Sequence, residues 1–251
     1  MGLDSETGDG PWPTGPAASA EEAVLRPVRT GNAFEETVQR LMQMVKLGLV
    51  GPGERLPPER ELSARLGVGR DTLRDAIASL ADAGYLLVRR GRYGGTFVAD
   101  ELPPTPAPGR RGFDRAEIDD VVGLREILEV GAARLAAGSD LSAADREQLF
   151  EALAELESAS PDDYRRLDSR LHLSIAELAG VPSLLPLVAE SRMRVNALLD
   201  DIPLLPRNIE HADEQHRALV TAILTGRADE AARLMSEHVQ ASAALLRAFL
   251  S

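Results

Sequence analysis

Apolar residues recur at helical spacing along most of the chain, and glycine- or proline-rich breaks separate the periodic stretches. The first helical pattern begins at Phe34, and two further patterns cover about 59–65 and 70–83. Gly84 stands where a C-terminal cap belongs, and the segment 85–99 has the composition of two short strands around a Gly-rich turn. The pattern therefore predicts helix, helix, turn, helix and β-hairpin, in that order.

The rest of the chain is helical throughout, with Gly138, Gly180 and Gly226 at the breaks between patterns. The predicted helices lie near 114–137, 142–158, 161–179, 183–200, 207–225 and 228–250. The fold class predicted is mainly α. It combines a winged helix-turn-helix, with a small β wing, and a C-terminal all-α antiparallel helical bundle.

Two segments lack periodicity and mark the domain boundaries. Residues 1–31 are rich in Gly, Pro, Ser, Ala and acidic residues, which is typical of a disordered tail. Residues 101–112 contain four prolines within six positions, which predicts a stiff linker. The sequence thus predicts a winged helix-turn-helix domain over 32–100 and a helical domain over 113–251.

Composition narrows the class of protein. The chain has 251 residues and no cysteine, which excludes disulfides, thiolate metal sites and cysteine nucleophiles. No apolar run has membrane-spanning length and the N-terminus lacks a secretory signal pattern, so we expect a cytoplasmic protein without a membrane partner. The net charge of -12 is uneven, because 113–251 carries -11 whereas 32–100 carries +1. The acidic total therefore does not exclude nucleic-acid binding by the first domain.

The segment 59–86 has the features of a helix-turn-helix. Apolar residues form a seam between its two helices, and Gly67 permits the sharp turn. Four residues lie on the exposed start of the second helix, where a recognition helix meets base edges: Arg70, Asp71, Thr72 and Arg74. The basic run at 89–92 lies at the hairpin tip, where a wing would meet the DNA backbone or minor groove. The alternative is a solvated, charged helix–loop–helix without nucleic acid.

Four polar residues interrupt apolar helix faces in the second domain. Asp168 and His172 lie one turn apart on one helix, while His216 and His238 align with apolar residues on two later helices. Together they suit a divalent metal ion, zinc first, with nickel, manganese or iron as alternatives. Facing helices of a bundle do build such sites. The alternative is that each histidine is a hydrogen-bonded core residue.

Three further polar residues lie on or near apolar stripes and predict an anion site. Arg125 aligns with apolar residues of its helix and would pair with a carboxylate, because guanidinium binds carboxylate in a bidentate manner. Arg192 and Asn196 are weaker candidates for lining the same cavity. The alternative for Arg125 is a side chain at the stripe's edge that extends its charge to solvent.

The stretch 52–98, beginning "PGERLPPERELSARLGVGRDTLRDAI", resembles the winged helix-turn-helix of GntR-family transcription regulators. The resemblance implies DNA contacts from Arg60, Arg70, Thr72 and Arg74, and from Arg90 and Gly91 in the wing. Gly69 stands where the family usually has Ser or Thr as the helix cap, and glycine is a weaker cap. The wing has one residue more than the common family pattern.

The segments "VVGLREILEVGAARLAA", "RLDSRLHLSIAELAG" and "EQHRALVTAILTGRADEAARLMSEHV" resemble the FCD effector-binding domain of the fatty-acid-regulator (FadR-like) subfamily. The resemblance implies that Asp168, His172, His216 and His238 are the metal ligands and that Arg125 lies near the effector. It also implies a homodimer, a small organic acid as effector, and a short palindromic operator in double-stranded DNA.

The expected function is therefore a ligand-responsive transcription regulator and not an enzyme. We expect it to act as a repressor. One alternative is a metal-dependent hydrolase tethered to a DNA-binding domain, because Asp and three His with open positions could activate water. Glu177 is the only nearby candidate for its general base, and it lies off the apolar stripe. A second alternative is a helical domain that only dimerises.

Overall fold

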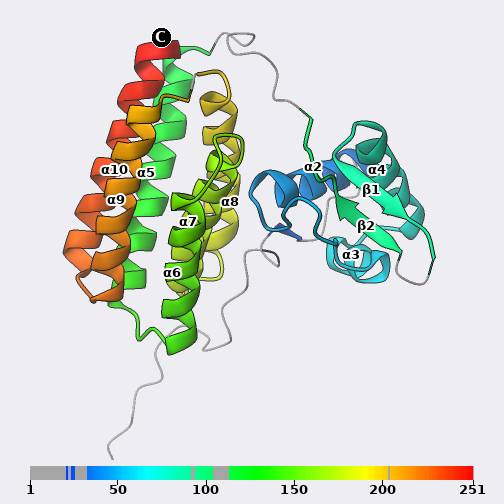
Figure 1. The fold of residues 1–251 in the computed structure, drawn as a ribbon, viewed down its shortest axis with the longest axis horizontal. Coiled ribbons are helices and arrows are strands. Elements are labelled where there is room, and N and C mark those ends of the chain that lie inside the picture. Colours follow the sequence, from blue (N-terminus) through cyan, green and yellow to red (C-terminus); the bar gives the residue numbers. More distant parts are fainter. Residues whose placement is uncertain are drawn as a thin grey trace, which may run out of the picture.

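A computed structural model describes residues 21, 24–25, 33–91, 94–103, 113–202 and 204–250. In the first part of the chain, the elements are α2 (Ala33–Lys46), α3 (Glu59–Leu66), α4 (Arg70–Asp82), β1 (Leu86–Arg89) and β2 (Gly95–Val98). Together they form an N-terminal unit in which α2 packs on α4 and the hairpin follows α4 (Figure 1). The predicted order of elements is confirmed.

A left-handed residue makes the turn between α3 and α4. Gly67 has a φ of 66°, and its N–H donates to the Ser63 carbonyl oxygen at the end of α3. A side chain with a Cβ would be strained in this conformation, which explains glycine at the turn. Leu62 and Leu66 of α3 and Leu73 of α4 are completely buried, so the two helices are held together by an apolar seam.

The wing is a two-stranded antiparallel sheet in which Leu86 pairs with Val98 and Arg89 pairs with Gly95. The segment before α3 covers the other edge of β2, because Gly53 N–H donates to Val98 O (3.1 Å) and Leu56 N–H donates to Thr96 O (2.9 Å). The edge of β2 is therefore paired, and the hairpin is anchored to the helix-turn-helix.

Within the described residues, the second part of the chain is a bundle of six helices. They are α5 (Arg115–Gly138), α6 (Ala143–Glu157), α7 (Tyr164–Leu178), α8 (Leu184–Leu199), α9 (Pro206–Leu224) and α10 (Ala228–Leu250). The longest, α5 and α10, lie side by side and antiparallel (Figure 1), since Asp119 near the start of α5 pairs with Arg247 near the end of α10 at 2.9 Å. The mainly α class with a small wing is confirmed.

Local chemistry sets where these helices begin. Asp114 caps α5 by accepting from Glu117 N–H (2.7 Å), and Ser142 and Asp145 form a capping box at α6. The predicted start of the third bundle helix near 161 is three residues early. Ser160 and Asp163 instead close a turn, in which the Ser160 hydroxyl donates to the Asp163 carboxylate (2.9 Å), and α7 begins only at Tyr164.

The expected disordered tail holds residues that pack on the folded chain. Val24 and Leu25 are buried, and Glu21 forms an ion pair with Arg65 at 3.1 Å. Burial of these two adjacent apolar side chains stabilises their packing on the folded chain, although the sequence around them is mostly polar. The remainder of 1–31 and residues 104–112 of the predicted linker lie outside the described residues. Within the described part, no helix is long and apolar enough to cross a membrane.

Candidate functional site

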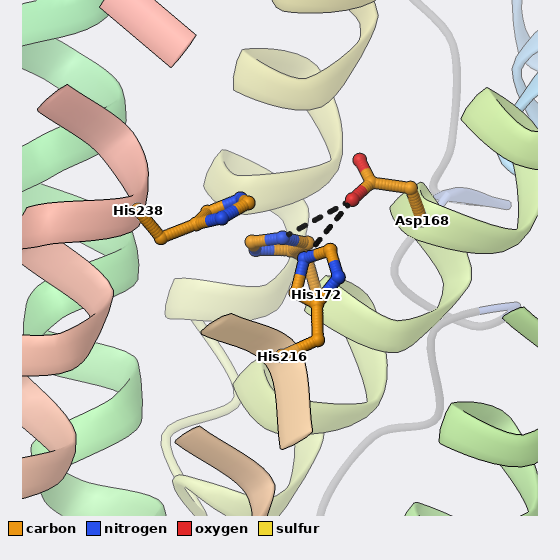
Figure 2. A group of neighbouring side chains, drawn as sticks. All are labelled: Asp168, His172, His216 and His238. Carbon is orange, nitrogen blue, oxygen red and sulfur yellow. Dashed lines mark ion pairs between the residues drawn. The ribbon is translucent and has the colours of Figure 1, made fainter. Parts of the chain in front are cut away.

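Three helices of the bundle bring four metal-ligating side chains together. Asp168 and His172 come from α7, His216 from α9 and His238 from α10 (Figure 2). One donor atom from each residue lies within 4.8 Å of the others, and all four side chains are buried. The centroids of the three imidazole rings are 4.5 to 5.5 Å apart. The sequence pattern thus led to residues that do converge; we call these four the Asp–His cluster.

The contacts within the cluster leave donor atoms unused. Asp168 Oδ1 lies 3.2 Å from His216 Nε2 and 3.6 Å from His172 Nε2, without the geometry of a hydrogen bond. Both ring nitrogens of His172 and both of His216 are buried without a hydrogen-bond partner among the described residues. Buried polar atoms in folded proteins are nearly always paired. The unpaired nitrogens therefore fit a cation at the centre of the cluster.

The electrostatic environment keeps Asp168, His216 and His238 in the state that a metal requires. Burial raises the pKa of Asp168, but the positive charge of Arg192 and the contacts with His172 and His216 together outweigh burial and hold that pKa well below its usual range. Burial lowers the pKa of His216, and burial together with the neighbouring His216 lowers the pKa of His238 well below its usual range. An ionised carboxylate and neutral imidazoles are the forms that bind metal ions.

Sequence reasoning missed one buried residue beside the cluster, Glu129 on α5. Its Oε2 lies 2.8 Å from His172 Nδ1 and accepts a hydrogen bond from Arg125 Nε at 3.0 Å. Burial raises the pKa of Glu129, but the charge of Arg125 and contact with His172 lower it below its usual range. Its position four residues after Arg125, on the same helix face as the buried Ala132, was the available signal.

Arg192 and Asn196 lie on α8 and contact α7 next to the cluster. Arg192 Nη2 donates to Asp168 Oδ2 and to Ser169 Oγ, and Asn196 Nδ2 donates to the same Ser169 hydroxyl at 2.9 Å. Arg192 Nε and Nη1 and Asn196 Oδ1 are buried without a hydrogen-bond partner among the described residues, although Arg192 Nη1 lies in an ion pair 3.7 Å from Glu129 Oε1. Both side chains are buried and keep polar atoms that no described residue satisfies.

A cavity of about 400 Å³ opens beside the cluster. Its wall includes Asp168, His238 and Arg125, but neither Arg192 nor Asn196. The only hydrogen bond from the Arg125 guanidinium to a described residue comes from its Nε, so its two terminal nitrogens have none. Of the three residues predicted to bind an effector, Arg125 is thus the one that reaches this cavity.

The residues predicted to contact DNA lie on α3, on the first turns of α4 and just after β1. Arg70, Asp71 and Arg74 are exposed on the first turns of α4, where Thr72 is half-buried and Gly69 is the N-cap residue without a side-chain bond. Arg74 Nε pairs with Glu59 at 2.9 Å.

Arg60 is exposed on α3, and Arg90 and the left-handed Gly91 (φ 104°) are exposed just after β1. The next two residues of the wing tip lie outside the described residues. Exposed arginines therefore lie at the first turns of α4 and at the described end of the wing, the two places where the sequence predicts contacts with DNA.

Known proteins resemble this chain over both parts. The chain is 34% identical to a protein of Mycobacterium gastri that carries the name HTH-type transcriptional regulator RmpR, over 81% of this chain and 76% of the relative. It is 30% identical to an Escherichia coli protein named as an L-lactate dehydrogenase operon regulatory protein, over 82% of this chain and 83% of the relative. The solved structure of E. coli McbR/YncC shares the fold, with a TM-score of 0.53 and 20% identity over 86% of this chain and 97% of that one.

Two family models match the chain in the order of its two parts. Residues 34–98 match the model described as bacterial regulatory proteins, gntR family, and residues 120–241 match the FCD domain. The first match spans the helix-turn-helix and wing, and the second spans the bundle that holds the Asp–His cluster. The chain belongs to the GntR family of bacterial transcription regulators and carries an FCD effector-binding domain.

Proposed function

We propose that this regulator holds a divalent metal ion in the Asp–His cluster and responds there to a small carboxylate effector. One observation supports this proposal most directly. One ionised carboxylate and three imidazoles lie together in a buried space, and several of the ring nitrogens have no hydrogen-bond partner among the described residues. A set of hydrogen-bonded core histidines would not leave those nitrogens unpaired. The donor set has no thiolate, and nitrogen and oxygen donors suit zinc first, with nickel or manganese as alternatives.

The ion would supply a Lewis-acidic centre to which a carboxylate oxygen binds. Arg125 supplies the complementary charge, because its terminal guanidinium nitrogens have no described partner and it lines the adjoining cavity. Arg192 and Asn196 have unpaired polar atoms on the other side of Asp168 and are proposed as further contacts. The name of the E. coli relative, which refers to the L-lactate dehydrogenase operon, is consistent with an organic acid as the effector class.

The N-terminal unit would bind double-stranded DNA through the start of α4 and the wing. Arg70 and Arg74 are exposed where guanidinium groups can meet guanine edges, and Thr72 and Asp71 lie on the same turns. Arg60, Arg90 and Gly91 are proposed as contacts to the DNA backbone. Repression by occupancy of a promoter is the proposed mode of action.

A homodimer would present two such units to a short palindrome. An apolar stripe on the bundle supports this part of the proposal, and its exposed members are Leu124, Ile127 and Leu135 on α5 and Leu187 on α8. The ion pair of Asp120 with Arg194 at 2.5 Å fixes the register of these two helices. Ile127 lies seven residues after Asp120, and Leu187 lies seven residues before Arg194. We infer that Ile127 and Leu187 therefore lie at the same level of the two helices. Large apolar side chains gathered on a surface mark an interface.

The rival function, a metal-dependent hydrolase, lacks a well-placed base among the described residues. Glu129 is close to the cluster, but its Oε2 contacts Arg125 and His172, and its Oε1 lies 3.7 Å from the Arg192 guanidinium. Glu177 is half-buried on α7 and is not part of the group that could hold an ion. Hydrolysis of esters, amides or phosphoesters by zinc-loaded protein would favour this rival.

The test starts from duplexes selected by the full chain from a random-sequence pool. Fluorescence anisotropy then measures the affinity for the best duplex with zinc, with chelator, and with L-lactate or other monocarboxylates added to each. The proposal predicts sequence-specific binding whose Kd changes at least tenfold with a carboxylate when zinc is present, and not with chelator. Failure to select any preferred sequence, or a carboxylate response that ignores the metal, would contradict it. Transcription in vitro from a promoter that overlaps the duplex distinguishes repression from activation.

A further inference from the structure

The cavity beside the Asp–His cluster has a charged end and an apolar body. At the charged end, the described wall holds Arg125, Asp168 and His238. Apolar side chains dominate the rest of the wall, and they come from the end of α8, the start of α9, the segment between these two helices, and α10. They include Leu199, Ile202, Leu204, Ile209, Ala241 and Leu245. At about 400 Å³, the cavity falls within the range of about 300–1,000 Å³ usual for small-molecule pockets.

The cavity runs along α10 away from the cluster. His238, Ala241, Leu245 and Ala248 all line it and follow one another on the same helix face. Ten residues separate His238 from Ala248, which corresponds to about 15 Å along a helix axis. Alanine at two of these four positions leaves room that larger side chains would fill. Ala241 and Leu245 are half-buried and Ala248 is exposed, so the cavity is long enough for a ligand with an extended tail and is open at its far end.

Beyond the charged end, several polar side chains on the wall are paired within the protein, Gln215 with His238 among them, whereas Asn208 and His211 of α9 have no hydrogen bond to a described side chain. The Tyr164 hydroxyl donates to Asp213 (2.9 Å), and the Arg165 guanidinium donates to Asp200 (3.2 Å) and to the Ile202 carbonyl oxygen (2.9 Å). The Ser242 hydroxyl donates to a backbone carbonyl of its own helix. A hydroxyl-rich tail would find partners at Asn208 and His211, but along the rest of the wall it would lose its hydrogen bonds to water and gain few from the protein.

The contrast between the two ends identifies the ligand class. We propose that the effector is a monocarboxylic acid with an apolar tail, whose carboxylate lies at Arg125 and the Asp–His cluster and whose tail lies along α10 as far as Ala248. The inference rests on the proposed function, because it places the head group at the proposed metal site. It goes further by excluding short hydroxy acids, dicarboxylates and sugar acids as the best ligands.

Calorimetric titration of the full zinc-loaded chain with two sets of acids tests the inference. The first set is acetate, butyrate, hexanoate, octanoate and decanoate, and the second is L-lactate, succinate and gluconate. Each added methylene that enters an apolar cavity should lower Kd by about two- to fourfold, until the chain reaches the end of the cavity. The binding stoichiometry should stay at about one acid per chain.

Two cavity-filling variants locate the tail. Ala248→Leu should weaken decanoate binding at least fivefold and leave butyrate binding unchanged, because it fills only the far end. Ala241→Leu, closer to His238, should weaken every acid from hexanoate upward. Ala154→Leu on α6, an exposed alanine that does not line the cavity, is the matched control. Zinc affinity is measured on each variant and should not change.

The outcomes separate the inference from the proposed function. If L-lactate, succinate or gluconate binds more tightly than octanoate, the apolar-tail inference is wrong while a carboxylate effector at the metal stands. If Ala248→Leu and Ala154→Leu have the same effect on decanoate, the tail does not lie along α10 and the inference is also wrong. If no acid of either set binds while zinc does, both the inference and the effector part of the proposed function fail.

Discussion

Glu129 Oε2 lies 2.8 Å from His172 Nδ1 in the interior of the bundle, where both side chains are almost completely buried. A carboxylate at Nδ1 favours the tautomer in which that nitrogen carries the proton. The lone pair is then on Nε2, the nitrogen that faces Asp168. Carboxylates of this kind orient histidine ligands and raise their basicity in metal sites. Glu129 is therefore expected to position His172 without binding the metal itself.

Glu129→Gln should weaken zinc binding by about 10- to 100-fold, the usual effect of losing such a supporting carboxylate. The amide keeps an oxygen acceptor for His172 but removes the negative charge that faces Arg125 and His172. Competition with a chromophoric chelator measures the change. Glu117→Gln, an exposed position on the same helix, is the control and should bind zinc as the wild type does. Equal affinities for both variants would show that Glu129 has no role at the site.

Arg70→Ala and Arg74→Ala should each weaken binding to the selected duplex by roughly 5- to 150-fold, the loss expected for one arginine–guanine contact. Binding to unrelated duplexes should change much less, because contacts to phosphate do not read the sequence. Arg233→Ala removes an exposed arginine of α10 and serves as the control. A uniform loss on all duplexes would indicate that these arginines contact only the backbone.

Ile127→Asp should convert a dimer into a monomer, since it places a charge in the centre of the apolar stripe on α5 and α8. Ile127 has 74% of its surface exposed in the single chain. Light scattering after size-exclusion chromatography gives the mass directly. Phe150→Asp changes a comparably exposed apolar residue on α6 and should leave the dimer intact. If both variants keep the wild-type mass, the interface lies elsewhere.

The metal-free protein should become less stable as the pH falls below about 6.5, the usual histidine pKa. Burial lowers the pKa of His216 and of His238 in the folded chain, so below that pH the unfolded chain binds more protons than the folded chain. Each histidine then contributes a loss of up to about 1.4 kcal/mol per pH unit, down to its folded pKa. Urea unfolding in the presence of chelator measures this dependence. A free energy of unfolding that stays constant from about pH 8 to pH 5.5 would contradict these lowered pKa values.

Much of this arrangement is predictable from the sequence because helix period and local caps determine it. The positions of Asp168, His172, His216 and His238 on apolar faces could be read directly, since a 3.6-residue period fixes which side chains share a face. What a period cannot provide is the relation between helices. The pairing of Glu129 with His172, and the turn of Arg192 toward Asp168, depend on how α5, α7 and α8 pack.

The same reason explains why Arg125 alone reaches the cavity. Arg125, Arg192 and Asn196 all lie on or near apolar stripes, but only the packing of α8 against α7 turns the last two toward Ser169. The anchoring of Val24 and Leu25 was missed because two apolar residues within a polar segment give no periodic signal.

Zinc titration of the wild type and of His216→Ala is the decisive test of the metal site. We expect one zinc ion per wild-type chain, a loss of at least 100-fold in affinity for His216→Ala, and wild-type binding for the exposed His211→Ala. Circular dichroism confirms that both variants are folded. A wild-type chain that binds no stoichiometric metal, or a His216→Ala variant that binds zinc as tightly as the wild type, would show that the Asp–His cluster is not a metal site.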